Sequence, residues 1–318
     1  MTVLERFQQG DIRALSRIVS FVEDQEDGYR ELLGRLYTSV GRSLRIGVTG
    51  PPGAGKSSLV NALTHQLLAD ENRVGIVAVD PTSPFTGGAL LGDRVRMNEF
   101  PPDGRVFFRS MATRGATGGL ANATSNVTVV YDGFGFDVTL IETVGVGQVE
   151  LDIINACDVV VVVLVPESGD SVQTMKAGLM EIADIFCVNK ADRPGAERIA
   201  NELRHALDTR KKEEGGWSIP IVPTEAVNRK GIDKLLGKIN GFIEYMKTSG
   251  KFAQHRRDQI KNQILNVLRY RFQQEFIENL LASDEFRTIL DKIYSGENDP
   301  YSAGDNLYRK YCRTDNGP

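Results

Sequence analysis

The amino-acid sequence predicts a doubly wound α/β fold with a mostly parallel sheet. Between residues 44 and 246, short runs rich in β-branched residues and bounded by Gly, Pro or Asp alternate with helix-length amphipathic stretches. Several of these runs are apolar on both faces, so helices have to cover both sides of the sheet. The expected strands are Arg45–Thr49, Arg73–Val79, Arg105–Arg109, Asp137–Ile141, Asp158–Val165, Asp184–Val188 and Ile219–Val222.

Residues 1–43 are predicted to form an N-terminal helical segment. Thr2 and Glu5 have the spacing of a capping box, and Asp11 is a good N-cap for the amphipathic stretch that follows it. The next helix is expected to begin near Tyr29 and to stop at Gly41, where glycine adopts a left-handed cap without strain. This segment is interpreted as a packing or partner-docking arm.

Residues 247–318 are predicted to form a C-terminal helical extension. After a break at Gly250, one long helix from Ala253 to Leu281 carries a wide apolar stripe, which we expect to pack on its own domain or on a second subunit. Seven basic residues lie between Lys247 and Arg271. We expect them to form a solvated helix face, with an acidic partner surface as the alternative.

The composition excludes several classes of protein. The 318 residues include 38 basic and 42 acidic ones, a net charge of −4, and no aromatic-interleaved basic platform, which argues against nucleic acid as a partner. The longest aliphatic run, Val159 to Val165, is seven residues and far too short to span a membrane. The start of the chain does not read as a secretory signal and the three cysteines suit buried thiols, so a cytoplasmic location is expected, or the mitochondrial matrix if a transit peptide has been removed.

A phosphate-binding loop follows the first predicted strand. The run from Gly50 to Ser57 matches G-x-x-x-x-G-K-[ST] between a strand and a helix, the context that makes this motif credible. Backbone N–H groups of such a P-loop surround the β-phosphate, Lys56 reaches the β- and γ-phosphates, and the Ser57 hydroxyl ligates Mg²⁺. The residues expected to bind the phosphates are Gly53, Ala54, Gly55, Lys56, Ser57 and Ser58. The fold prediction is therefore that of a P-loop NTPase.

A second motif indicates which base is bound. Asn189, Lys190 and Asp192 form an N-K-x-D box at the end of a predicted strand. The Asp192 carboxylate can accept hydrogen bonds from N1–H and the exocyclic amine of guanine, a pair of donors that adenine lacks, while the Lys190 stem covers the purine. GTP and GDP are therefore the expected nucleotides.

Three acidic residues are candidates for the metal site. Glu142 ends the strand before Thr143-Val144-Gly145, Asp80 ends another strand, and Asp93 lies in a glycine-rich loop. An acid at a strand end beside the P-loop can hold Mg²⁺ directly or through water, and the Gly145 N–H can contact a γ-phosphate. The predicted metal ligands are Ser57, Asp80, Asp93 and Glu142; which acid contacts Mg²⁺ directly is left open.

Taken together and in order, these motifs closely resemble those of the MeaB/ArgK group of P-loop GTPases, the chaperones of methylmalonyl-CoA mutase that include the human methylmalonic aciduria type A protein. The resemblance extends over nearly the whole chain. It implies a homodimeric, Mg²⁺-dependent GTPase that binds an adenosylcobalamin-dependent acyl-CoA mutase of the methylmalonyl-CoA mutase type, gates cofactor loading and protects the mutase from inactivation.

The resemblance also assigns roles to loops of this chain. Those around Asp93, from Glu142 to Gln148 and from Gly169 to Lys176 correspond to switches I, II and III; without the resemblance, the third is also compatible with a plain surface loop. The expected catalytic residues are Lys56, Asp93, Glu142 and Lys176. Gln148 is not assigned the role of positioning water, and slow turnover that the partner accelerates is expected.

One loop departs from the pattern of the family. On the guanine side, where a Ser-Ala pair is common, this chain has Thr224-Glu225-Ala226. A backbone N–H to the guanine oxygen survives that change, whereas a hydroxyl contact does not. Glu225 and Ala226 are therefore retained as expected nucleotide contacts.

Three other functions share parts of this pattern. A metal-insertion GTPase of the hydrogenase or urease maturation type needs clustered soft or imidazole ligands, but the three histidines are scattered and no Cys-x-x-Cys occurs. A transport-associated ATPase or kinase requires adenine preference, against which the N-K-x-D box argues. A nucleotide switch without useful turnover would use the same loops and is not separated by sequence.

Overall fold

The computed structural model describes residues 2–39, 41–80, 99–112, 119–143, 156–168, 179–208 and 216–312. The chain forms two compact units, Met1–Gln263 and Ile264–Pro318. Among the described residues, no helix combines the length and apolar content needed to cross a bilayer.

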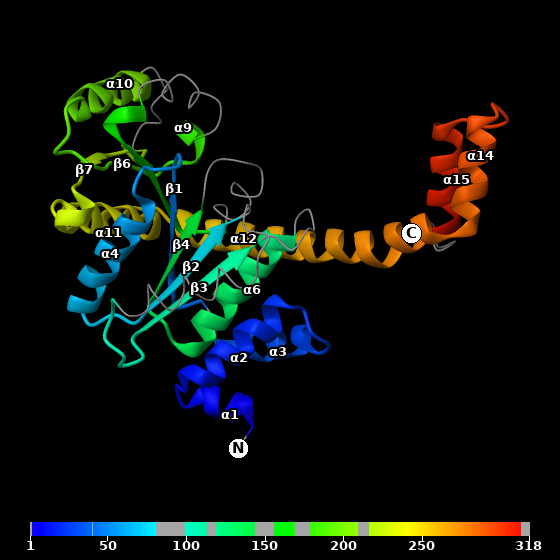
Figure 1. Cartoon of the computed structure of the whole chain (residues 1–318), viewed down its shortest axis with the longest axis horizontal. Coiled ribbons are helices and arrows are strands. Elements are labelled where there is room, and N and C mark those ends of the chain that lie inside the picture. Colours follow the sequence, from blue (N-terminus) through cyan, green and yellow to red (C-terminus); the bar gives the residue numbers. More distant parts are fainter. Residues whose placement is uncertain are drawn as a thin grey trace. The chain divides into compact units, whose positions relative to one another are not determined.

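The first unit contains a seven-stranded parallel sheet in the order β3-β2-β4-β1-β5-β6-β7 (Figure 1). This confirms the predicted fold class and all seven predicted strands. The register pairs Val48 of β1 with Glu142 of β4, and Thr49 with Val162 of β5, so the residues that follow these strands emerge at one edge. The strands are β1 (Leu44–Thr49), β2 (Val74–Asp80), β3 (Val106–Ala112), β4 (Val138–Thr143), β5 (Val159–Leu164), β6 (Ile185–Val188) and β7 (Ile221–Pro223).

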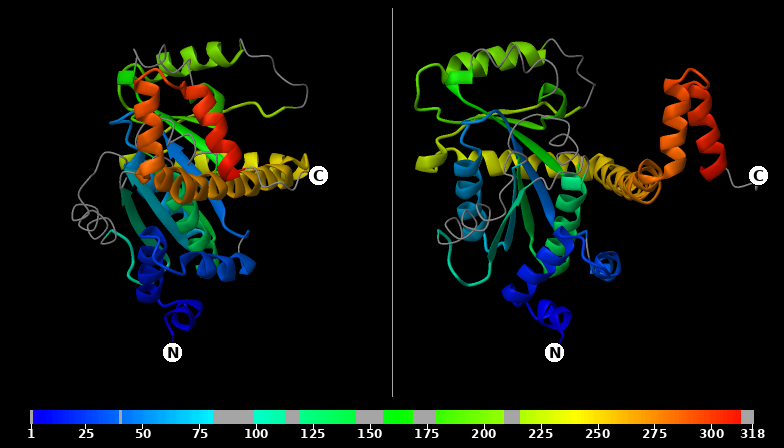
Figure 2. Two further views of the ribbon diagram at one scale, coloured as in Figure 1. Left: turned by 90° about the vertical axis from the view of Figure 1, so that its right-hand side faces the viewer. Right: turned by 45° about the vertical axis from the view of Figure 1, so that its right-hand side comes forward.

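Helices cover both faces of the sheet, as the doubly apolar strands require (Figures 1 and 2). One face packs against α4 (Lys56–Ala69) and α11 (Ile232–Thr248). The other packs against α2 (Ile12–Glu23), α6 (Gly119–Phe134) and α10 (Ala196–Asp208). β5 supplies both cores, because Val161 and Val163 face one side while Val160 and Val162 face the other. Two short elements lie between β5 and β6 in the chain: the 3₁₀ turn η2 (Pro166–Ser168) and α9 (Leu179–Ile182).

The N-terminal helices are part of the core of the first unit. α1 (Val3–Gln8) has the predicted capping box between Thr2 and Glu5, and Asp11 caps α2 as expected. The prediction was wrong about α3 (Tyr29–Leu36), which ends five residues before Gly41 and continues as the 3₁₀ turn η1 (Tyr37–Ser39). The Asp132 carboxylate accepts hydrogen bonds from the N–H groups of residues 41–43, so a side chain rather than a continued helix satisfies this stretch of backbone.

The beginning of α12 (Lys251–Arg271) is tied to the sheet by a buried polar cluster. Arg256 Nη2 donates to Asp158 Oδ2 at 2.6 Å and to the Ser43 carbonyl at 2.9 Å. Asp158, whose side chain is fully buried, also accepts from the Arg45 N–H at 2.8 Å. The basic stretch is therefore not uniformly solvated as predicted: Arg256 turns inward, because a buried carboxylate ahead of β5 needs a cationic partner.

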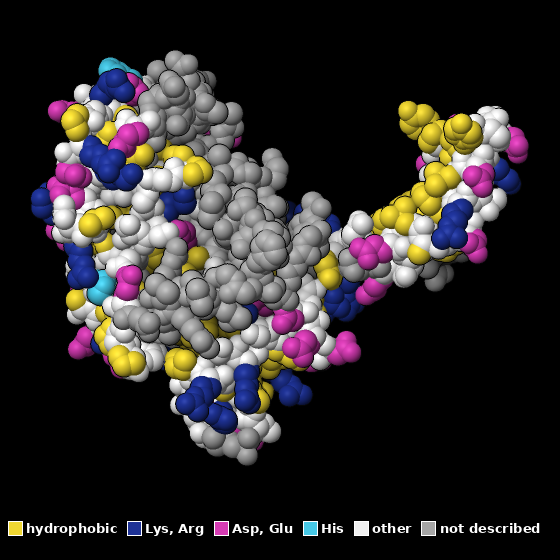
Figure 3. Space-filling view, in the orientation of Figure 1, with side chains coloured by type: hydrophobic (Ala, Val, Ile, Leu, Met, Phe, Trp, Pro, Cys, Tyr) yellow, Lys and Arg dark blue, Asp and Glu magenta, His cyan; other side chains and the backbone are white. Residues whose placement is uncertain are grey.

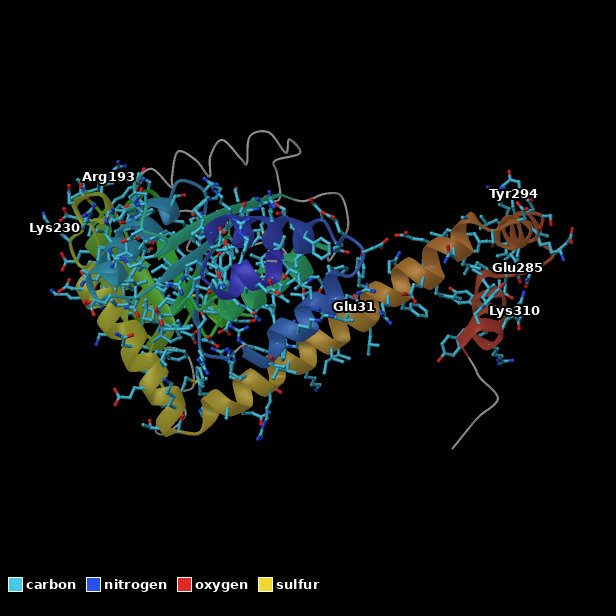
Figure 4. All side chains as sticks on the ribbon, turned by 90° about the horizontal axis from the view of Figure 1, so that it is seen from below. Glu31, Arg193, Lys230, Glu285, Tyr294 and Lys310 are labelled. Atoms are coloured by element: carbon cyan, nitrogen blue, oxygen red, sulfur yellow. The ribbon has the colours of Figure 1, made fainter. Side chains whose placement is uncertain are left out.

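The second unit is a helical extension with little core of its own. The predicted long helix is present, although a π-helical turn at Phe272–Ile277 (η5) separates α12 from α13 (Glu278–Ala282). α14 (Asp284–Tyr294) and α15 (Pro300–Cys312) are joined by Lys310 Nζ, which donates to Glu285 at 2.7 Å (Figure 4). Among the residues described here, Ala303 and Leu307 alone are buried in this unit.

Hydrophobic side chains are widely exposed on this second unit, as Figure 3 shows. Tyr294 is 97% and Tyr301 87% exposed, values typical of side chains without a partner in the single chain. The exposed large apolar residues are Ile264, Leu265, Val267, Leu268, Phe272, Leu281, Leu290, Tyr294, Tyr301, Tyr308 and Tyr311. Extensive exposed apolar surface of this kind is typical of regions that contact a partner.

Candidate functional site

The loop between β1 and α4 has a backbone that glycine alone accommodates at two positions. Gly50 has φ +144°, and a Cβ there would lie 2.1 Å from the Val163 carbonyl oxygen of the neighbouring strand. Gly55 has φ +83°, and a Cβ there would lie 2.4 Å from Asn189 Nδ2. The chain thus curls tightly into the N-terminus of α4, where unpaired N–H groups and the helix dipole favour an anion.

Lys56 is the first residue of α4, and its side chain reaches back to this loop. Its side chain is buried, and Nζ donates to the Gly50 carbonyl at 2.8 Å and to the Pro51 carbonyl at 2.9 Å. Burial lowers the pKa of Lys56, and the nearby Glu142 carboxylate opposes that shift. Two neutral carbonyls therefore hold the ammonium group at the loop, and a bound phosphate would add negative charge to that of the nearby Glu142.

Ser57 and Glu142 bring two oxygen atoms that can ligate a metal ion together beside the loop. Ser57 Oγ donates to Glu142 Oε1 at 2.5 Å, and Glu142 is 4% exposed. Next to them, Thr143 Oγ1 donates to Thr49 Oγ1 at 2.9 Å and ties the ends of β4 and β1 together. Hydroxyl and carboxylate oxygens are the ligands that Mg²⁺ prefers, so this pair fits a magnesium ion beside a bound phosphate.

Asn189 connects the phosphate loop to the base-reading loops. Its side chain is buried; Nδ2 donates to the Ala54 carbonyl at 3.0 Å, and Oδ1 accepts from Thr224 Oγ1 at 3.2 Å and from the Ala226 N–H at 3.0 Å. One amide thus makes three hydrogen bonds to two separate segments. The sequence suggested Asn189 as a base contact, and the structure shows it also as a clamp that fixes the distance between the two halves of the site.

Lys190 and Asp192 follow this clamp. Lys190 has φ +55°, and its Nζ donates to the Gly53 carbonyl at 2.9 Å, so the aliphatic stem runs along the P-loop. Asp192 is exposed, and the Ala191 N–H donates to the Thr224 carbonyl at 3.0 Å, which anchors the turn that carries it. An exposed carboxylate on an anchored turn can accept hydrogen bonds from a purine.

The loop from Thr224 to Lys230 forms the far wall of the site. Glu225 pairs with Lys230 in an isolated antiparallel bridge, and its carboxylate accepts from Asn228 Nδ2 at 2.9 Å and from Lys230 Nζ. The hydrogen bonds from these two side chains lower the pKa of Glu225. Glu225 is therefore turned toward its own loop, and the Ala226 N–H, expected to face guanine, donates to Asn189 in this structure. Figure 4 shows Arg193 and Lys230 at the same edge of the first unit.

A cavity of about 310 Å³ lies beside the start of α4. It is lined by Ser57, Ser58 and Asn61 from α4, and by Ala226 and Arg229 from the opposite loop, which contains the 3₁₀ turn η4 (Ala226–Asn228). The rest of its lining comes from Val60, Ile76, Glu99, Phe100, Phe108 and Val227, so the cavity adjoins the phosphate site along α4.

Four other predicted site residues lie wholly or partly outside the described residues. Asp93, Gly145 and Lys176 lie outside the described residues, and so does the side chain of Asp80, although β2 carries its backbone to the same edge as Glu142. Among the residues that are described, no group of three His, Cys, Asp or Glu side chains could hold a metal ion together.

Two contributors were missed from the sequence. Thr224 Oγ1 donates to Asn189 Oδ1, and its place directly before Glu225 and Ala226 was the available signal. The Thr49–Thr143 pair depends on the neighbouring positions of β1 and β4, which the sequence does not reveal.

Comparison with known proteins identifies the family. The profile described as methylmalonyl-CoA mutase-associated GTPase MeaB matches residues 15–280. A Pyrococcus abyssi protein provisionally named a GTPase is 46% identical over 310 residues, covering 97% of this chain and 95% of that protein. GTPase ArgK of Escherichia coli is 31% identical over 290 residues, covering 89% and 86%.

Two further proteins are similar to this chain over most of its length. The mitochondrial methylmalonic aciduria type A homolog of Mus musculus is 31% identical over 320 residues, covering 95% of this chain and 77% of that protein. The crystal structure of a LAO/AO transport system kinase superposes with a TM-score of 0.72 at 25% identity, covering 98% and 97% of the two chains. The motifs predicted this outcome: the chain belongs to the family of methylmalonyl-CoA mutase-associated GTPases, MeaB.

Proposed function

We propose that this protein binds Mg²⁺·GTP between the P-loop and the N-K-x-D turn, hydrolyses it to GDP and phosphate, and acts as the chaperone of an adenosylcobalamin-dependent acyl-CoA mutase. The proposed nucleotide site rests on the hydrogen bonds of Asn189 to both loops. Because one buried side chain bonds both to Ala54 of the phosphate loop and to Ala226 of the opposite loop, the two form one continuous site.

In this proposal the chain orients the triphosphate and stabilises its charge. The N–H groups at the start of α4 and the Lys56 ammonium hold the β- and γ-phosphates, where negative charge is distributed during transfer of the γ-phosphoryl group to water. Ser57 and Glu142 would hold Mg²⁺, which supplies further charge neutralisation when bound. Asp192 would accept the N1–H and amine protons of guanine, with Lys190 packed along the base.

The base is tested by calorimetry on nucleotide-free protein. We expect GDP and GTP to bind at least tenfold more tightly than ADP and ATP, because adenine offers no pair of donors to Asp192. Equal affinity for adenine and guanine nucleotides would favour the alternative of an ATPase or kinase, a possibility raised by the name of the LAO/AO transport system kinase.

The mutase partner is proposed from the family. The MeaB profile is named for its association with methylmalonyl-CoA mutase, and the mouse relative is named for methylmalonic aciduria. A homodimer is supported by the exposed apolar residues of the second unit, which has too few buried residues to stabilise itself alone. Light scattering of the full chain is expected to give twice the mass of one chain.

Gating is tested by comparing nucleotide states with candidate mutases that use adenosylcobalamin. We expect binding of the mutase to differ between GDP and a non-hydrolysable GTP analogue, and turnover to rise when the mutase is added. A difference in binding without any hydrolysis would identify a nucleotide switch instead. Retention of a transition metal after dialysis would favour a metal-insertion GTPase.

A further inference from the structure

A second cavity lies at the opposite edge of the sheet from the P-loop. It measures about 790 Å³ and is bounded by residues just ahead of β5, β6 and β7, including Asp158, Asp184 and Ser218. The carboxyl ends of these strands point to the nucleotide site, so this cavity at their amino ends is separate from it. Its volume is within the range of pockets that enclose small ligands.

One wall of the cavity is aromatic and fixed in place. Trp217 packs against Phe242 and Tyr245, with ring centroids 5.2 Å and 5.7 Å away. The indole N–H donates to the Asp184 carbonyl at 2.9 Å, which holds the ring in one orientation. Trp217 is only partly buried although most of its core neighbours are sealed from solvent, so the wall offers a flat apolar surface on which a planar ring can stack.

The rim of the cavity carries positive charge. Arg204 at the end of α10 and Lys251 at the start of α12 are exposed and line it, and Lys251 Nζ donates to the Tyr245 hydroxyl at 3.2 Å. Among the acids, Asp158 is neutralised by its contacts with Arg45 and Arg256. Asp208 at the end of α10 is exposed and also lines the cavity, so the rim combines two cations with one acid. The rim can therefore hold an anionic group close to the aromatic wall.

Asp184 adds a polar group on the floor. Its Oδ2 accepts from the Val160 N–H at 2.8 Å, and burial raises the pKa of this carboxyl to about 7 despite that hydrogen bond. Near neutral pH both protonation states are present, so the carboxyl can either accept a hydrogen bond from a ring nitrogen or donate one to it.

We propose that this cavity is a second ligand site, which binds a planar heteroaromatic molecule carrying an anionic group, of the purine mononucleotide class. The ring stacks on Trp217, and the anionic group lies between Arg204 and Lys251. No role in GTP hydrolysis is assigned to it, and the proposal does not depend on the function argued above.

The chain offers a direct readout, because Trp217 is its only tryptophan. The experiment titrates full-length protein with AMP and follows the fluorescence of Trp217, in a background that carries Lys56→Ala and Asp192→Asn to disable the P-loop site. We expect saturable quenching. Adenosine, which lacks the phosphate, should bind about tenfold more weakly, and ribose 5-phosphate, which lacks the ring, should not quench.

Two variants test the rim. Arg204→Ala combined with Lys251→Ala is expected to weaken AMP binding about tenfold while leaving GDP binding of the otherwise wild-type protein unchanged. Lys238→Ala, an exposed lysine of α11 that does not line the cavity, is the matched control and should bind AMP normally.

The proposal is overturned if AMP up to millimolar concentration leaves the fluorescence unchanged. It is also overturned if quenching is lost in the P-loop background, since AMP would then be acting from the nucleotide site. Equal binding of adenosine and AMP, or an undiminished affinity in the rim variant, would refute the assigned role of Arg204 and Lys251. None of these outcomes bears on whether GTP binds at the P-loop.

Discussion

Ser57 Oγ lies 2.5 Å from Glu142 Oε1, and the two residues come from segments 85 positions apart in the chain. The pairing of Val48 with Glu142 between β1 and β4 brings them together, because the P-loop leaves the end of β1 where β4 also ends. Glu142, the penultimate residue of β4, is therefore brought to the phosphate site by the order of the strands.

Glu142→Gln is expected to slow GTP hydrolysis by roughly 10²-fold while GDP affinity changes by a few-fold at most. Glutamine keeps the acceptor for the Ser57 hydroxyl but removes the charge that favours Mg²⁺. Single-turnover rates across a magnesium titration, with GDP calorimetry as the control for folding, measure both effects. An unchanged rate at limiting magnesium would exclude Glu142 from the metal site.

Asp192→Asn is expected to reverse the choice of base. Guanine donates two hydrogen bonds to the carboxylate, whereas xanthine presents one donor and one acceptor, which match an amide. Affinity for GDP should fall by roughly 10- to 100-fold, and affinity for xanthosine diphosphate should rise above it. Competition binding of the two nucleotides decides the matter; loss of both without a reversal would show that Asp192 does not contact the base.

The sequence predicted those features that depend on local pattern. All seven strands were found because a strand buried on both faces, such as β5, is nearly continuous in Val and Leu. The P-loop and the N-K-x-D turn were found because their spacing is local. The sequence did not predict the clamp role of Asn189, because its partner Ala54 is distant in the chain. It did not predict the inward turn of Arg256 either, because its partner Asp158 is also distant in sequence.

Asp158→Asn is expected to destabilise the first unit by about 3–5 kcal/mol, because it leaves the partly buried guanidinium groups of Arg45 and Arg256 without a counter-charge. Denaturant unfolding measures the change. The matched control is Asp284→Asn, which removes an exposed pair with Arg287 and should cost less than about 1 kcal/mol. Similar losses in the two variants would mean that the cluster around Asp158 contributes no more than a surface ion pair.

Asp184→Asn is expected to change how stability depends on pH. Burial raises the pKa of Asp184 to about 7, so between its ordinary value and pH 7 the folded protein binds more protons here than the unfolded chain does. This contribution to stability is complete at low pH and is lost as the pH rises to 7. The asparagine keeps an acceptor for the Val160 N–H but cannot ionise. The free energy of unfolding of the variant, taken relative to that of wild type, should therefore rise by roughly 3 kcal/mol between pH 5 and pH 8.

Urea unfolding of both proteins at the two pH values provides the measurement. Asp233→Asn, at an exposed position of α11, controls for the loss of one carboxyl group. Its free energy of unfolding should differ from that of wild type by nearly the same amount at both pH values. If the free energies of unfolding of Asp184→Asn and wild type differed by the same amount at both pH values, Asp184 would titrate normally in the folded protein.

Gly55→Ala is expected to abolish nucleotide binding while the sheet remains folded. The added Cβ would lie 2.4 Å from Asn189 Nδ2 at a residue with φ +83°, so either Asn189 leaves Ala54 and Ala226 or the P-loop shifts. Both responses separate the phosphate loop from the base-reading loops. The control is Gly237→Ala in α11, where a Cβ meets nothing within 4 Å and the helix should gain about 0.5–1 kcal/mol. If GDP bound to the Gly55→Ala variant with wild-type affinity, the close approach of Gly55 and Asn189 would not be a requirement of the site, and the Asn189 clamp would lose its role in joining the two halves.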